Sequence, residues 1–144
     1  MAIKQRYKLY RAEEDATTPC RWFSSVEGAQ MWLDKKVRTK WWRKVTDVRH
    51  VKLVYPYGGG MCGATKEGVV LTVCVIPDSL CVPTLIHELA HGVVWIPGHD
   101  SEKDHGPRYA GALIECYRHF DCAEAAEDLE DAFDEAGVKY EAFG

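Results

Sequence analysis

Alternation of polar and apolar residues predicts β-strands in the first half of the chain. The alternation runs from Gln5 to Tyr10 and again from Val48 to Tyr55, and a period of two places one set of side chains on one face of a sheet. The run from Val69 to Ile76 is dense in β-branched residues and ends at Pro77, which is typical of a strand. A fourth short strand between Met61 and Lys66 has a weaker pattern. The sequence therefore predicts a small sheet of three to four strands.

Helical patterns occupy most of the remaining chain. Ser24-Ser-Val-Glu27 has the form of a capping box and predicts a helix over residues 25–38. Proline suits the first turn of a helix and glycine its end. On this basis three further helices are predicted, over Pro83 to Trp95, Pro107 to Phe120, and Cys122 to Ala136. Because the chain has no linker, repeat or low-complexity tract, we predict one α+β domain spanning residues 1–144.

Length and composition agree with a globular domain. The chain has 144 residues, of which 47% are hydrophobic and 28% are charged, and these are ordinary values. No stretch approaches the roughly 20 apolar residues that span a bilayer, and the N-terminal segment lacks the apolar core of a secretory signal. We therefore expect a soluble cytoplasmic protein with no membrane partner. Its six cysteines, none in a C-x-x-C spacing, are expected to be reduced and mostly buried.

The segment His87-Glu88-Leu89-Ala90-His91 is an H-E-x-x-H motif inside a predicted helix. Residues four apart lie one turn apart on the same helix face, so the two imidazoles can bind one metal ion. Glu88 lies about 100° around the helix from His87 and can reach a water molecule at that ion without being a ligand. The motif therefore predicts a zinc site with His87 and His91 as ligands and Glu88 as the general base. The opposite side of the helix is apolar and is expected to face the core, through Leu85, Ile86, Leu89 and Val93.

A catalytic zinc usually has three protein ligands, so a third is expected downstream. The metzincin spacing requires glycine at position 94 and histidine at position 97, where this chain has Val94 and Pro97; that class is excluded. The candidates that remain are His99, His105, Glu102 and Glu115. We favour His105, because the adjacent Gly106-Pro107 would hold it at a helix start with little steric hindrance. His99 and the carboxylates stay open as alternatives.

Together the two histidine segments resemble those of the SprT-like metalloproteases. The signature of that family joins HExxH to a downstream His-Gly-Pro-aromatic segment, and here HELAH is followed by HGPRY at residues 105–109. The chain is similar in more detail to a family of small metallohydrolases of actinobacteria and their phages. The further shared features are the opening Leu9-Tyr-Arg-Ala-Glu13 segment and a closing helix that ends in Gly137-Val138.

This resemblance implies a zincin-like fold in which His87, His91 and His105 bind one Zn²⁺ per chain. The implied activity is hydrolysis of peptide bonds in a protein or peptide substrate, with Glu88 assisting the attack of zinc-bound water. The usual HGPEF segment of the family is altered at Arg108 and Tyr109, so its substrate preference does not carry over. The zinc ribbon of some SprT-like proteins is also missing from the sequence, so the resemblance does not imply the partner interactions that such a region mediates.

Charge is distributed unevenly along the chain. Residues 1–54 carry 13 Lys/Arg against 6 Asp/Glu, whereas residues 55–144 carry 5 against 16. Within the basic part, the segment from Lys35 to Lys44 contains Trp41 and Trp42, and basic groups beside stacking rings suit single-stranded nucleic acid. We favour the alternative, in which the tryptophans cover the core while the lysines remain in water.

Three functions are compatible with these patterns. The first is a zinc metallopeptidase, the second is a zinc hydrolase of a non-protein amide, and the third is a non-catalytic zinc-containing binding module. Glu88 argues against the third, because a structural zinc site does not require a general base. We therefore expect an enzyme, and a metallopeptidase in the first place.

Overall fold

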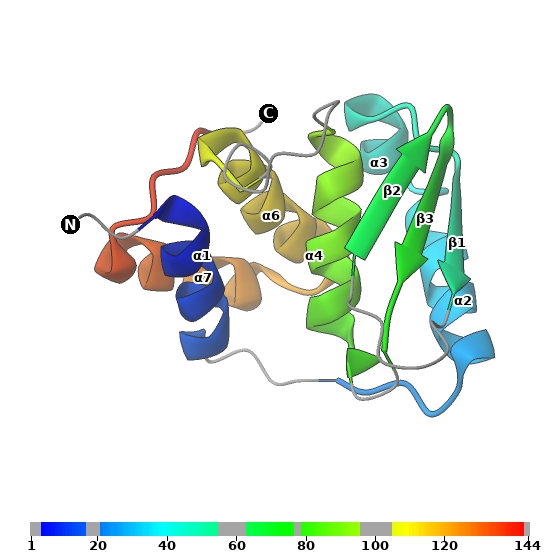
Figure 1. Ribbon diagram of the computed structural model, residues 1–144, viewed down its shortest axis with the longest axis horizontal. Helices are drawn as coiled ribbons and strands as arrows, with labels where there is room; N and C mark the ends of the chain where they lie inside the picture. Colours follow the sequence, from blue (N-terminus) through cyan, green and yellow to red (C-terminus); the bar gives the residue numbers. More distant parts are fainter. Residues whose placement is uncertain (1–3, 17–20, 55–62, 77–78, 96–104, 143–144) are drawn as a thin grey trace. The chain divides into compact units, whose positions relative to one another are not determined.

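The computed structural model describes residues 4–16, 21–54, 63–76, 79–95 and 105–142 (Figure 1). The chain divides into two compact units, one of residues 20–93 and the other of residues 1–19 and 94–144. The described residues contain one three-stranded sheet and six α-helices. This confirms the predicted α+β class and a sheet of three strands. No helix in the described ranges combines the length and apolar character that a membrane span requires.

The unit of residues 20–93 is built around strands β1 (His50–Val54), β2 (Gly63–Glu67) and β3 (Val70–Cys74). Their order is β1-β3-β2, with β3 parallel to β1 and antiparallel to β2. Gly68 has a φ of 60° between β2 and β3, a left-handed conformation that favours glycine in a tight turn. One face of the sheet is buried, as the alternation predicted for β1; the buried side chains of β1 and β3 are Val51, Leu53, Leu71 and Val73.

Three helices complete this unit: α2 (Val26–Lys36), α3 (Lys40–Val45) and α4 (Val82–Val93). The N-cap of α2 is Ser25, whose hydroxyl accepts a hydrogen bond from the Gly28 N–H at 3.0 Å. The N-cap therefore lies one residue after Ser24, the first residue of the predicted capping box. Within the unit, α2 packs against β1, and α4 packs against β2 and β3 (Figure 1).

The basic, tryptophan-containing segment forms the last turn of α2 and the short helix α3. Thr39 caps α3 by accepting a hydrogen bond from the Trp42 N–H at 3.4 Å. Trp42 is fully buried, and its indole Nε1 donates to the Val48 carbonyl oxygen at 2.8 Å. Trp42 is thus a core residue with its ring inaccessible to a nucleic-acid base, while Trp41 is half-buried.

The other unit is helical and comprises α1 (Gln5–Asp15), α6 (Pro107–Phe120) and α7 (Ala123–Ala136). Helix α7 packs against both α1 and α6. The bounds of α6 match the prediction, and α7 begins one residue after the predicted start. At the end of α7, Gly137 has a φ of 73° and the Val138 N–H donates to the Phe133 carbonyl oxygen at 2.9 Å. Glycine in this conformation is a common helix terminator.

The predicted strand from Gln5 to Tyr10 is wrong, because these residues form the first part of helix α1. No residue of α1 is β-branched, and long unbranched side chains lose little rotamer freedom in a helix. The buried residues are Leu9 and Ala12, which are three apart and therefore share a helix face. An alternation of only a few residues is too short to distinguish the period of a strand from that of a helix.

Helix α6 is crossed at Gly111 by the C-terminal segment. A Cβ atom at Gly111 would overlap the backbone carbonyl oxygen of Glu141, and the Glu141 N–H donates to the Pro107 carbonyl oxygen at 3.0 Å. We expect Gly111→Ala to lower the free energy of unfolding by about 1–3 kcal/mol through overpacking. This loss should exceed the gain of about 1 kcal/mol from the better helix former. Urea unfolding monitored by circular dichroism measures the net change in the free energy of unfolding.

A truncated chain provides the control for this prediction. When the chain ends at Val138, nothing crosses Gly111, and Gly111→Ala should be neutral or stabilising. If Gly111→Ala stabilised the full chain as well, the close approach of Glu141 to α6 would be refuted.

Candidate metal centre

The HExxH motif lies on α4, as predicted. Leu85, Ile86 and Leu89 are buried, whereas His87 and His91 are half-buried. The two imidazoles are neighbours, with ring centroids 5.1 Å apart and ring planes inclined at 75°. The helical spacing of four residues therefore places both rings together on one face, while the apolar residues anchor the helix in the core.

Glu88 is a buried carboxylate beside this pair. It is 4% exposed, and its Oε1 lies 3.8 Å from His87 Nε2. Burying a carboxylate is costly, and such groups in a cluster with other titratable side chains are frequently functional. Glu88 is thus a buried carboxylate next to one of the two histidines of the motif.

The end of α4 that carries His91 is fixed by a close approach to the sheet at Gly92. A Cβ atom at Gly92 would lie 2.9 Å from Leu71 Cδ2 and 3.6 Å from Trp42 Cη2. The Gly92 carbonyl oxygen, in the last turn, accepts a hydrogen bond from the Thr46 hydroxyl at 3.0 Å. Because only a residue without a side chain fits here without displacing Leu71, Gly92 lets α4 lie close to β3.

His105 lies in the helical unit, two residues before the first residue of α6. It is 6% exposed. Its imidazole is contacted edge-on by two tyrosine rings: Tyr10 of α1, with ring centroids 5.0 Å apart, and Tyr109 of α6, with centroids 5.1 Å apart. The Tyr10 hydroxyl lies 3.2 Å from His105 Nε2 and 3.4 Å from Nδ1. A buried imidazole is therefore held between two helices of its own unit.

Three of the described histidines could each offer one imidazole nitrogen to a metal ion: His87 and His91 from α4, and His105 from the helical unit. Glu115, a carboxylate candidate, is outside this set and forms ion pairs with Arg118 and His119 on the surface of α6. The other two candidates, His99 and Glu102, lie outside the described residues. The candidate set thus contains the three histidines that the sequence favoured.

Tyr10 is a residue near His105 that the sequence analysis missed. It is separated from His105 by 95 positions in the chain, and no motif links the two segments. Of the polar side chains at the start and centre of α6, Tyr109 and Tyr117 are buried, and Arg108 is exposed. No local sequence pattern indicated Tyr10, because its position depends on how α1 packs in the helical unit.

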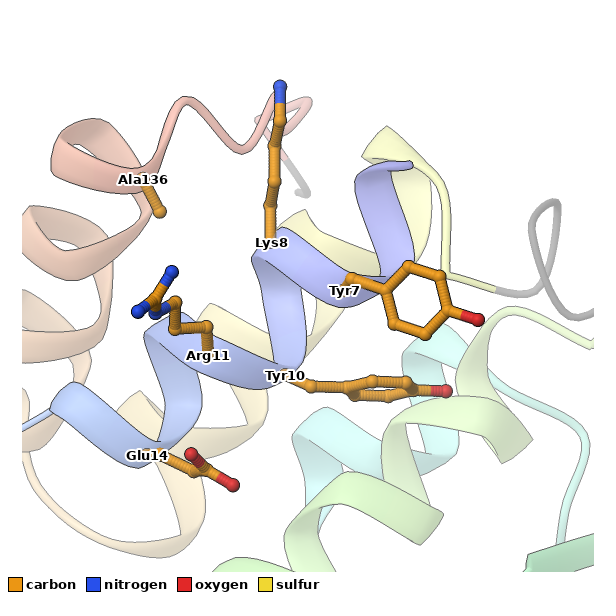
Figure 2. A pocket seen from close by; sticks show the side chains of 6 residues that line it. All are labelled: Tyr7, Lys8, Tyr10, Arg11, Glu14 and Ala136. Carbon is orange, nitrogen blue, oxygen red and sulfur yellow. The ribbon is translucent and has the colours of Figure 1, made fainter. Parts of the chain in front are cut away.

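Tyr10 also lines a pocket of about 450 Å³ on α1. The pocket is bordered by Tyr7, Lys8, Tyr10, Arg11, Glu14 and, from α7, Ala136 (Figure 2). Figure 2 shows the rings of Tyr7 and Tyr10 extending to the same side of α1, with the Arg11 side chain extending to the other side. The tyrosine that contacts His105 is therefore accessible from this pocket.

The described cysteines take no part in the metal set. Cys81 and Cys116 are buried, Cys74 is half-buried, and the exposed Cys122 accepts a hydrogen bond from the Ala125 N–H at the start of α7. Burial raises the pKa of the Cys116 thiol well above its ordinary value, so Cys116 is suited neither to nucleophilic attack nor to thiolate ligation.

No family model matches the chain, and no curated protein or solved structure shows significant similarity to it.

Proposed function

We propose that this protein is a zinc metallohydrolase, and specifically a metallopeptidase. The observation that carries the proposal is the arrangement on α4: two half-buried imidazoles with ring centroids 5.1 Å apart, and the buried Glu88 carboxylate next to them. A helix that served only to fill the core would not need a buried carboxylate beside two histidines. A hydrolytic metal site needs both the ligands and a base.

His105 is the proposed third ligand, contributed by the helical unit. The donor set of three imidazoles fits Zn²⁺, for which histidine is a preferred ligand and three protein ligands are typical of catalytic sites. Such a set leaves a coordination position for the reaction. The burial of His105 supports this assignment, because a buried imidazole requires polar partners, and a metal ion would be one.

In the proposed hydrolysis of a peptide bond, the zinc ion and the residues of α4 would have separate roles. Zinc in such a site polarises a carbonyl group and makes water more acidic. Glu88 would accept a proton from the attacking water molecule and deliver it to the leaving amine, as a general base and then a general acid. The apolar residues around it on α4 would limit access of bulk water to the carboxylate, which strengthens its electrostatic interactions.

A zincin-like fold is part of the same proposal. The motif helix α4 packs against β2 and β3 of a small mixed sheet, so one side of the helix is anchored while the histidines occupy another. Together with the HELAH and HGPRY segments, this arrangement supports kinship with the SprT-like metalloproteases. The substrate we propose is a protein or peptide.

Metal analysis combined with peptide cleavage tests this function. Protein purified without added metal is expected to contain close to one zinc per chain. It should cleave members of a mixed peptide library, lose cleavage on treatment with a chelator, and regain it when zinc is restored. A protein that binds no zinc would contradict the metal assignment. Tight zinc binding without cleavage of peptides or other amides would favour a non-catalytic module.

A further inference from the structure

Tyr10 is held in a defined position within the helical unit. Helix α1 buries Leu9 and Ala12 and packs against α7. The Gln5 side chain makes two hydrogen bonds to the backbone of Lys139: Nε2 donates to the carbonyl oxygen at 2.7 Å, and Oε1 accepts from the N–H at 3.2 Å. These contacts hold α1 in place, and α1 in turn holds the Tyr10 hydroxyl next to His105.

The Tyr10 hydroxyl is within reach of both nitrogens of the His105 ring, at 3.2 Å from Nε2 and 3.4 Å from Nδ1. A hydrogen bond from Nε2, the nearer nitrogen, to this hydroxyl would leave Nδ1 free to bind a metal ion. A neutral imidazole that ligates through one nitrogen carries its proton on the other, where it donates. A hydroxyl can accept that hydrogen bond, and in doing so it would fix the tautomer.

We propose that Tyr10 is the positioning residue for His105, orienting the imidazole and selecting the tautomer that can bind the metal. Tyr109 contacts the same ring, with planes inclined at 72°, and restricts its rotation by packing. Groups that hydrogen-bond to metal-binding histidines raise affinity by holding the ring in its binding orientation. The metal-binding part of this inference rests on the proposed function, whereas the orientation of His105 by Tyr10 does not.

Tyr7 supplies a matched control. It lies on the same helix, lines the same pocket and is 52% exposed. Its hydroxyl accepts a hydrogen bond from the neighbouring Arg6 at 2.9 Å. Tyr7→Phe and Tyr10→Phe therefore each remove one tyrosine hydroxyl from α1, and only the hydroxyl of Tyr10 is next to His105.

The experiment compares the two variants with the parent in two measurements. The first is the His105 tautomer ratio in metal-free protein, from ¹⁵N shifts at about pH 8.5, above the ordinary imidazole pKa of about 6.5. The second is zinc affinity, by competition with a chromogenic chelator. Tyr10→Phe is expected to shift the tautomer ratio and to weaken zinc binding by about 10–100-fold. Tyr7→Phe should leave the ratio unchanged and the affinity within about twofold, which is less than 0.5 kcal/mol.

The outcomes separate this proposal from the proposed function. If Tyr10→Phe leaves both the tautomer ratio and the zinc affinity unchanged, or if Tyr7→Phe alters them equally, the positioning role is refuted. A changed tautomer ratio in a protein that binds no zinc would support the positioning of His105 and contradict the metal function. Thermal unfolding of each variant verifies that the fold is retained. Replacing Tyr10 with phenylalanine keeps the contact of its ring with His105.

Discussion

Glu88→Gln should reduce hydrolysis by at least about 10²-fold while leaving zinc content near one per chain. Glutamine has nearly the same size as glutamate and retains a polar end, but it cannot accept a proton at neutral pH. A positioned general base contributes about 10²–10⁴-fold to the rate. Because Glu88 is buried next to His87 and is not among the proposed ligands, the variant should lose the base and keep the metal.

The measurement is kcat/KM on the best peptide found in the library, together with zinc content and thermal unfolding. Glu127→Gln is the matched control, because Glu127 is an exposed carboxylate on α7. It should retain the parent activity. If Glu88→Gln cleaved as fast as the parent, Glu88 would not be the base and the proposed chemistry would be wrong. A variant that lost its zinc instead would show that Glu88 supports the metal site.

His105→Ala should weaken zinc binding by more than about 100-fold, which exceeds the usual effect of losing a residue that only supports a ligand. Removing one of three imidazoles leaves the helical pair His87 and His91, and two ligands do not make the site typical of catalytic zinc. Peptide cleavage should fall with zinc occupancy. Zinc affinity by competition with a chelator and zinc content after dialysis are the measurements.

Controls for this variant address both chemistry and stability. His119→Ala removes an exposed histidine of α6 that pairs with Glu115, and it should bind zinc as the parent does. Because His105 is buried, the alanine variant could lose stability through a cavity, and His105→Gln keeps most of the volume. If both His105 variants were folded and bound zinc with full affinity, His105 would not be a ligand. His99 would then be the next candidate.

Helices whose ends carry strong local signals could be predicted closely from the sequence. Pro107 starts α6 and Gly137 ends α7, since the fixed φ of proline and the left-handed conformation of glycine act within one or two residues. The arrangement of His87, Glu88 and His91 could be predicted for the same reason, because a helix by itself sets the positions of residues one and four apart.

Local pattern failed where a segment was short or polar. The alternation from Gln5 to Tyr10 indicated a strand, although these residues are helical. No element was predicted from Lys40 to Val45, where six residues form α3 with Trp42 in the core. The weakly predicted strand between Met61 and Lys66 is confirmed as β2, although its sequence Gly-Ala-Thr-Lys-Glu has little apolar character and pairing with β3 supports its conformation.

Contacts between distant parts of the chain depend on the tertiary structure. The Tyr10 hydroxyl reaches His105 across 95 positions, Gly92 allows α4 to approach Leu71 and Trp42, and Glu141 crosses α6 at Gly111. Helical spacing is a local property, so the sequence alone predicted that His87, Glu88 and His91 lie close together on α4. The sequence could not determine what holds His105, since that depends on how α1 and α6 pack, and packing is set by many long-range contacts at once.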